Sequence, residues 1–175
     1  MLVRSASAAA AVLASFAFVS TMPAHAADPV LDGTYRLDFD GANRMINGAP
    51  SPTTNTSATY SFTSSCAPAA CVTRAVLLNT TDTEAVSAHN PDLSLEFVDG
   101  TWQLSLPYDT ACEDGSTRNQ LLTWSLTPAA GADTLKGSRT VATLVPCPGD
   151  EPGPLSQAMT ANRVGSAAPG VLPMP

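Results

Sequence analysis

The sequence predicts an exported all-β domain, either a single small antiparallel barrel or a β-sandwich, stapled by disulfides. Three observations support this: apolar and polar residues alternate with period two in seven or eight segments, no segment after the leader has an amphipathic helical period, and the cysteines are even in number. A meander barrel is slightly favoured over a sandwich, because pairing segment 157–164 with segment 33–39 would leave no open sheet edge.

The first 26 residues have the pattern of a secretory signal peptide. Arg4 is their only charge, an apolar stretch covers 8–19, and Ala24-His25-Ala26 supplies the small residues that a signal peptidase requires. That stretch is too short to cross a bilayer core of about 30 Å as a helix. We therefore expect cleavage after Ala26 and a secreted protein without a membrane span, with a β domain over 27–164 and a disordered tail over 165–175.

Charge and length limit the classes of partner. The 175-residue chain has a formal net charge of −7, and loss of the leader with Arg4 would leave 149 residues at −8, with Lys136 as the single lysine. That length suits one domain. An acidic domain has no electrostatic footprint for nucleic acid, so we expect no nucleic-acid partner.

Four cysteines follow the leader, and an even number in an exported chain indicates a disulfide framework. Three pairings are possible. We favour Cys66–Cys71 with Cys112–Cys147, because the first two flank one short turn. A zinc site would need more: there is no C-x₂-C pair, and His89 is the only histidine after the leader. We expect no metal and no cofactor.

The first half of the domain contains three predicted strands. In segment 33–39 the side chains of Tyr35, Leu37 and Phe39 share one face. Segment 41–57 holds Gly, Pro, Asn and Thr in no periodic order, which predicts a long loop that is functional or mobile. Two further strands are predicted, one around 60–63 and one over 72–78.

The strongest local signal is a hairpin over 93–106, turning at Asp99-Gly100. Counting outward from this turn pairs Phe97 with Trp102, and then pairs 95 with 104 and 93 with 106. All three pairs are apolar and share one face, so the turn and the hydrophobic pattern predict the same register.

Two or three strands complete the pattern. Alternation continues over 122–126, and 135–145 forms a long strand in which Gly137 predicts a bulge or bend. The proline-rich stretch 146–154 predicts irregular structure, and a last strand is expected over 157–164.

Five short strings are distinctive when taken together: Gly33–Ala42, Asn47–Pro52, Cys66 to Val72, Phe97–Gln103 and Ala161–Gly165. They resemble one actinobacterial family of mycobacterial secreted proteins and similar extracytoplasmic domains of some transmembrane Ser/Thr protein kinases. The resemblance covers roughly 32 to 165, although this chain shows neither a kinase domain nor a membrane helix. It implies an extracytoplasmic sensing or binding module and transfers no catalytic residue.

Catalytic constellations are weak, and we expect a protein that is not an enzyme. A Ser-His-Asp site would depend on His89, which lies in a polar turn. Asp38 and Asp40 share the polar face of a strand, where a solvated edge is favoured over a glycan hydrolase or a calcium loop. The glycan hydrolase remains the least favoured alternative.

The favoured function is binding of an extracytoplasmic ligand, an apolar or cell-envelope-derived molecule, inside a barrel. Aromatic side chains on inward faces would line the cavity, and the loop bearing Met45 and Ile46 would cover its mouth. A filled core is the competing interpretation. Another alternative is a protein-interaction or protease-inhibitor-like module presenting the Cys66–Cys71 loop. The aromatic candidates are Tyr35, Phe62, Phe97, Trp102 and Trp124.

Overall fold

The computed structural model describes residues 30–67, 70–81, 92–129, 133–150 and 152–168. The expected signal peptide, His89 and the last part of the expected tail lie outside these residues. Regular structure in the described part consists of strands alone, which confirms the all-β class. The strands are β1 (Gly33–Phe39), β2 (Met45–Ile46), β3 (Ala49–Pro50), β4 (Thr56–Ala67), β5 (Ala70–Thr80), β6 (Asp92–Val98), β7 (Thr101–Ala111), β8 (Thr117–Pro128), β9 (Thr134–Val145) and β10 (Pro154–Gly165).

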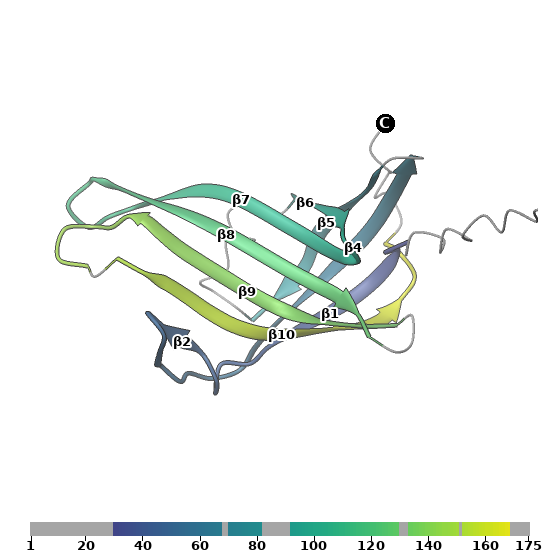
Figure 1. Ribbon diagram of the computed structural model, residues 1–175, viewed down its shortest axis with the longest axis horizontal. Coiled ribbons are helices and arrows are strands. Elements are labelled where there is room, and N and C mark those ends of the chain that lie inside the picture. Colours follow the sequence, from purple (N-terminus) through teal and green to yellow (C-terminus); the bar gives the residue numbers. More distant parts are fainter. Residues whose placement is uncertain (1–29, 68–69, 82–91, 130–132, 151, 169–175) are drawn as a thin grey trace, which may run out of the picture.

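Eight strands close an antiparallel barrel in the order β1-β4-β5-β6-β7-β8-β9-β10, with β10 returning to β1 (Figure 1). The closing ladder pairs Leu37 with Ala161 and Phe39 with Met159. The meander barrel is thus confirmed, and so is the pairing of the last strand with the first. Closure leaves this pair of strands without a free edge.

The long loop after β1 is more ordered than expected. It contains the β2–β3 hairpin, in which Ile46 pairs with Leu155 and Met45 pairs with Ser156 at the start of β10. Asn47 and Gly48 form its turn with φ of 51° and 76°, the positive values that a type I′ turn requires. The hairpin occupies the edge of β10 beyond the end of β1, so the expectation of a loop without regular structure was wrong here.

The predicted hairpin of β6 and β7 is correct only near its turn. Asp99 and Gly100 have φ of 49° and 82°, and Phe97 pairs with Trp102 as predicted. The ladder ends at Glu96 and Gln103, so the predicted pairs 95–104 and 93–106 are wrong. The two strands part because β6 stays paired with β5 over 92–96, while β7 follows β8 along its whole length.

Pro107 marks the stretch of β7 that β6 leaves unpaired. In a two-residue hairpin the flanking residues 98 and 101 form a hydrogen-bonded pair, and hydrogen-bonded positions then alternate along each strand. Residue 107 therefore directs its backbone nitrogen toward the side where β6 has departed. Proline lacks an N–H, so this position costs no ladder bond and makes the edge a poorer template for another strand.

Gly137 has a different role from the predicted bulge. The ladder runs without interruption through Gly137, which pairs with Leu126 on one side and Met159 on the other. The irregularity in the β8–β9 ladder lies between Asn119 and Gln120. Glycine is required at 137 because a Cβ there would lie 1.7 Å from the carbonyl oxygen of Ser125.

Both disulfides favoured from the sequence are present. Cys66–Cys71 closes the β4–β5 hairpin, and Cys112–Cys147 links the β7–β8 turn to the segment after β9, with Cα atoms 5.7 Å apart. The part of the expected tail that is described is bonded to the barrel, since the Ala168 amide donates to the buried Ser61 hydroxyl at 2.8 Å.

Candidate functional site

One end of the barrel is filled with aromatic side chains. Tyr35 packs edge-on against Phe62 with ring centroids 5.5 Å apart, and Tyr60 packs edge-on against Trp124 at the same distance. Trp102 is almost fully buried and lies 5.2 Å from the half-buried Phe97. These contacts are those of a close-packed core, so the aromatics expected to line a cavity pack against one another instead.

The segment before β1 plugs this same end. Leu31 is 3% exposed, and its backbone is fixed on both sides: its amide donates to Ser64 Oγ at 2.9 Å, while its carbonyl accepts from Ser64 and from the buried Thr73. β1 begins and β10 ends at this end of the barrel (Figure 1). An entrance to the barrel therefore lies at the opposite end.

The opposite end carries polar side chains among apolar ones. There β7, β8, β9 and β10 extend past the other strands as a curved sheet (Figure 1). Strand alternation continues the inward face of this sheet from apolar positions, such as Trp124 and Leu122, to polar ones beyond them. The polar inward residues are Tyr108, Thr110, Arg118, Gln120, Arg139, Thr143 and Gln157.

Arg139 lies where the apolar and polar parts of the interior meet. It pairs with Trp124 across the β8–β9 ladder, and its guanidinium carbon lies 4.4 Å from the centre of the Phe39 ring. Its Nη2 donates to Oε1 of the buried Gln157 at 2.7 Å. A cation–π contact and a neutral acceptor thus hold a positive charge inside the barrel of an acidic protein.

The positive charges of Arg139 and Arg118 both affect the pKa of Tyr108. Burial raises the pKa of Tyr108, while the positive charges of Arg139 and Arg118 oppose that rise. Both guanidinium groups therefore lie within electrostatic reach of the Tyr108 hydroxyl. The open end of the barrel carries two cations facing inward.

A pocket of about 260 Å³ opens on this inward face. Its walls combine hydrocarbon from three strands with polar atoms of β8 and β9, and the Gly153 backbone lies at its rim. The lining residues are Ile46, Arg118, Gln120, Val141, Thr143, Asp150, Gly153 and Leu155.

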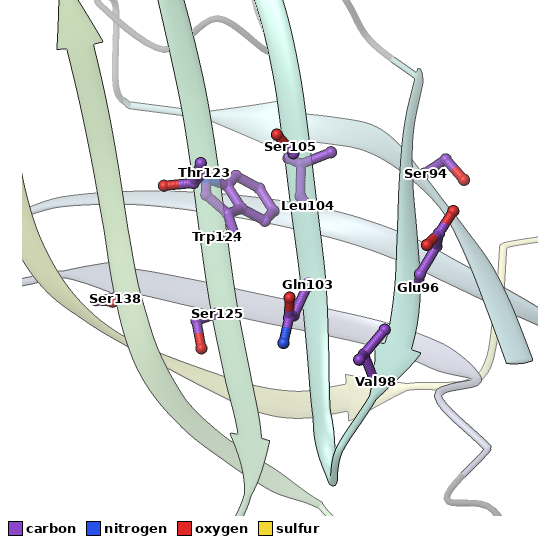
Figure 2. A pocket seen from close by; sticks show the side chains of 10 residues that line it. All are labelled: Ser94, Glu96, Val98, Gln103, Leu104, Ser105, Thr123, Trp124, Ser125 and Ser138. Carbon is purple, nitrogen blue, oxygen red and sulfur yellow. The ribbon is translucent and has the colours of Figure 1, made fainter.

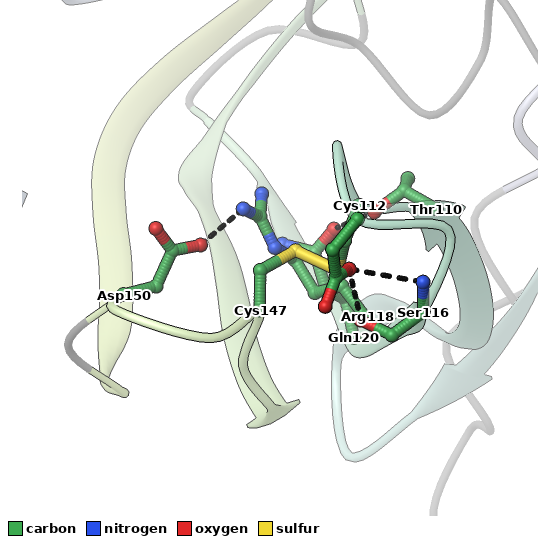
Figure 3. The surroundings of a disulfide bond; sticks show 8 residues. Thr110, Cys112, Ser116, Arg118, Gln120, Cys147 and Asp150 are labelled. Atoms are coloured by element: carbon green, nitrogen blue, oxygen red, sulfur yellow. Dashed lines mark hydrogen bonds and ion pairs between the residues drawn. A yellow bond between two sulfur atoms is a disulfide. The ribbon is translucent and has the colours of Figure 1, made fainter.

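The Cys112–Cys147 disulfide stands beside this pocket (Figure 3). Asp150, three residues after Cys147, forms an ion pair with Nη2 of Arg118. The amide of Asp150 donates to the carbonyl of Cys147 at 3.0 Å, so the carboxylate sits on a turn that the disulfide anchors. The covalent link thus positions the rim of the pocket.

The polar side chains under the disulfide are also bonded to one another. Thr110 Oγ1 donates to Gln120 Oε1 at 3.4 Å, and Ser116 donates to Asp114 at the tip of the β7–β8 turn (Figure 3). The bond from Thr110 orients Gln120 within the pocket wall, and the bond from Ser116 stabilises the turn.

Two other depressions lie on the outside of the barrel. The larger, about 670 Å³, runs over β6, β7, β8 and β9 and is lined mainly by hydroxyl and amide side chains, with Glu96 at one side (Figure 2). Val98, Leu104 and Trp124 add apolar surface to its lining. The second, about 550 Å³, lies over the outer face of β1 and contains Arg36, Asp38 and Asp40.

Asp38 and Asp40 are already engaged. Asp38 accepts from Arg36 at 2.8 Å, and Asp40 accepts from both the amide and the side chain of Asn43. Both carboxylates line the same outer depression, and each is held there by a neighbour on its own segment. Among the described residues there is also no group of three or more His, Cys, Asp and Glu placed to hold a metal ion.

Met45 and Ile46, which were predicted to cover the mouth of the barrel, point to opposite faces of β2. Ile46 lines the pocket, whereas Met45 precedes it on β2 and so points to the other face of the strand. Arg118 and Arg139 were missed by the sequence reasoning. The inward direction of Arg139 could have been found from the sequence, because it follows Leu135 and Gly137 at a spacing of two residues. The β2–β3 hairpin could also have been found, because Asn47-Gly48 is a strong signal for a two-residue hairpin turn.

The chain thus forms a small disulfide-linked β-barrel that is plugged at one end and has a mixed polar and apolar pocket at the other. The chain belongs to the family described as the PknI serine/threonine-protein kinase sensor domain, whose model matches residues 28–175. This confirms the resemblance to extracytoplasmic domains of mycobacterial Ser/Thr kinases. Among the described residues, no helix is long and apolar enough to span a membrane.

A solved structure supports the fold. The monomer form of the M. tuberculosis PknI sensor domain is similar, with a TM-score of 0.59 and 24% identity over 82% of this chain and 93% of that one. No curated protein matches the chain.

Burial of the tyrosines predicts loss of stability at alkaline pH. Burial raises the pKa of both Tyr35 and Tyr108 above the ordinary value of 10.0. The stabilisation from keeping them neutral is therefore complete below about pH 10 and is lost as the pH rises through the folded-state pKa values. Urea midpoints at pH 8 and pH 11 should differ less in Tyr108→Phe than in the wild type. Equal differences would contradict this.

Proposed function

We propose that this protein is a non-catalytic, extracytoplasmic binding domain that takes up a cell-envelope molecule with an apolar part at the open end of its barrel. One observation carries the proposal: the interior is filled and plugged at the end where β1 begins and β10 ends, while the other end has a pocket lined by Ile46, Val141 and Leu155. Membership of a sensor-domain family supports a binding role outside the cytoplasmic membrane.

The engaged carboxylates favour binding over hydrolysis. A glycoside hydrolase needs two carboxyl groups facing each other across the substrate. Asp38 and Asp40 are instead bonded to Arg36 and Asn43 on the outer face. Release into the extracellular space, expected from the leader, is part of the same proposal.

Ile46→Asp tests the location of the site. We expect native mass spectrometry of the purified protein, after incubation with a lipid extract of the cell envelope, to detect a retained molecule in the wild type. The Ile46→Asp variant should lose it, because a carboxylate replaces part of the apolar wall.

Met45→Asp is the matched control, since it places the same charge on the other face of β2 and should retain the adduct. Equal retention by all three proteins would move the site elsewhere. Absence of any adduct on the wild type would favour a protein-interaction module instead.

A further inference from the structure

The Arg118 guanidinium has a buried donor that no described group accepts from. Its side chain points into the pocket at the open end, and its guanidinium carries donors at Nε and at both Nη atoms. Asp150 contacts Nη2 alone. Nε is buried and, within the described part of the chain, has no hydrogen-bond partner. A buried donor without an acceptor is costly, which makes the unfilled side of this guanidinium informative.

The geometry of a guanidinium specifies what would fill it. Nε–H and an Nη–H form a planar fork, and a carboxylate or phosphate accepts from both with two of its oxygens. A neutral hydroxyl offers only one acceptor oxygen to that fork, and it adds no attraction between opposite charges. Arg139, deeper on the same inward face, adds a second positive charge within reach of Tyr108.

Asp150 is a replaceable occupant. The side chains of Arg118 and Asp150 are 33% and 44% exposed, and exposed ion pairs contribute little to stability. Asp150 also belongs to the segment after β9 rather than to the barrel wall. An incoming anion can therefore take its place without disturbing the ladders of β8 and β9.

We propose that the open-end pocket binds the anionic group of an amphiphile, a carboxylate or a phosphate ester, on the Arg118 guanidinium in exchange for the Asp150 carboxylate. The hydrocarbon of the ligand then lies against Ile46, Val141 and Leu155. This inference rests on the proposed function, because it assigns the chemistry of the ligand to the same pocket.

Isothermal titration calorimetry with three eight-carbon probes tests it: octyl phosphate, octanoate and the neutral octyl glucoside. We expect the wild type to bind at least one anionic probe tenfold or more tightly than the neutral one. Arg118→Gln should weaken that binding tenfold or more. Asp150→Asn should strengthen it several-fold, because the competing carboxylate is removed while the shape of the side chain is kept.

Arg36→Gln is the matched control. It removes the same charge and also breaks an ion pair with an aspartate, Asp38, but on the outer face. Its affinity for the anionic probe should equal that of the wild type. An NMR readout separates binding from mere stability: the Nε–H resonance of Arg118 should shift on titration with the anionic probe and stay unchanged with the neutral one.

The outcomes distinguish the two proposals. Equal binding of all probes, lost in Ile46→Asp but not in Arg118→Gln, would overturn the anion inference and leave the pocket as the site. Weaker binding by Asp150→Asn would overturn the exchange. No binding of an anionic probe by the wild type would overturn the inference outright, whereas the envelope-extract experiment would still decide the proposed function.

Discussion

Gly137→Ala is expected to lower the free energy of unfolding by more than about 3 kcal/mol, or to prevent folding. The new Cβ would lie 1.7 Å from the carbonyl oxygen and 2.7 Å from the carbonyl carbon of Ser125, both backbone atoms. The neighbouring strand cannot simply yield, because β8 is paired with β7 on one side and β9 on the other over almost its full length. One methyl group would therefore strain three strands at once.

Urea denaturation and the yield of folded protein measure this effect. Ser138→Ala is the control, because the adjacent side chain is exposed on the outer face and its removal should change stability by less than about 0.5 kcal/mol. A Gly137→Ala protein within about 1 kcal/mol of the wild type would contradict the close approach of β8 and β9.

Removal of the Cys112–Cys147 disulfide should cost about 4 kcal/mol, against about 2 kcal/mol for Cys66–Cys71. The difference follows from the loops that each bond closes in the unfolded chain, with sequence separations of 35 and 5 residues. Each bond is removed by changing both cysteines to alanine, and the unfolding free energies are compared in urea. A larger loss from the short loop would show that native packing, rather than chain entropy, dominates.

The same variant tests the role of the long-range disulfide in the pocket. Cys147 anchors the turn that carries Asp150. Removal of the disulfide should therefore weaken the ion pair between Arg118 and Asp150, in addition to lowering the stability of the whole protein. Removal of Cys66–Cys71, at the other end of the barrel, should leave binding at the pocket unchanged under conditions in which both variants are folded.

Much of the barrel was predictable because a strand's facing pattern is local. Tyr35, Leu37 and Phe39 are buried in β1 as their alternation indicates, and the Asp99-Gly100 turn forms as its dipeptide predicts. The predicted closure of the last strand onto the first is also found.

The hairpin register failed for a non-local reason. The turn determines the pairing of the residues next to it, up to Glu96 and Gln103. Farther from the turn, β6 remains paired with β5 and β7 remains paired with β8. Competition between neighbouring strands, which no short segment encodes, decided where the hairpin opens.

The candidate site was the least predictable part. The sequence placed five aromatics on inward faces and so determined what the interior is made of. It could not determine whether they would surround a space or fill it, because that depends on the barrel's register and volume. Nor could it bring Ile46, Arg118 and Asp150 together, since they lie on three separate segments of the chain.

What the sequence determined by itself is the strand periodicity, the favoured cysteine pairs and the family resemblance, all of which the structure or the comparisons bear out. The tertiary structure alone decided that the barrel is filled and plugged at one end and has a mixed polar and apolar pocket at the other. The physical reason is range: side-chain direction follows from φ and ψ of a single strand, whereas burial, cavity shape and the meeting of Arg118 with Asp150 follow from contacts between residues far apart in the chain.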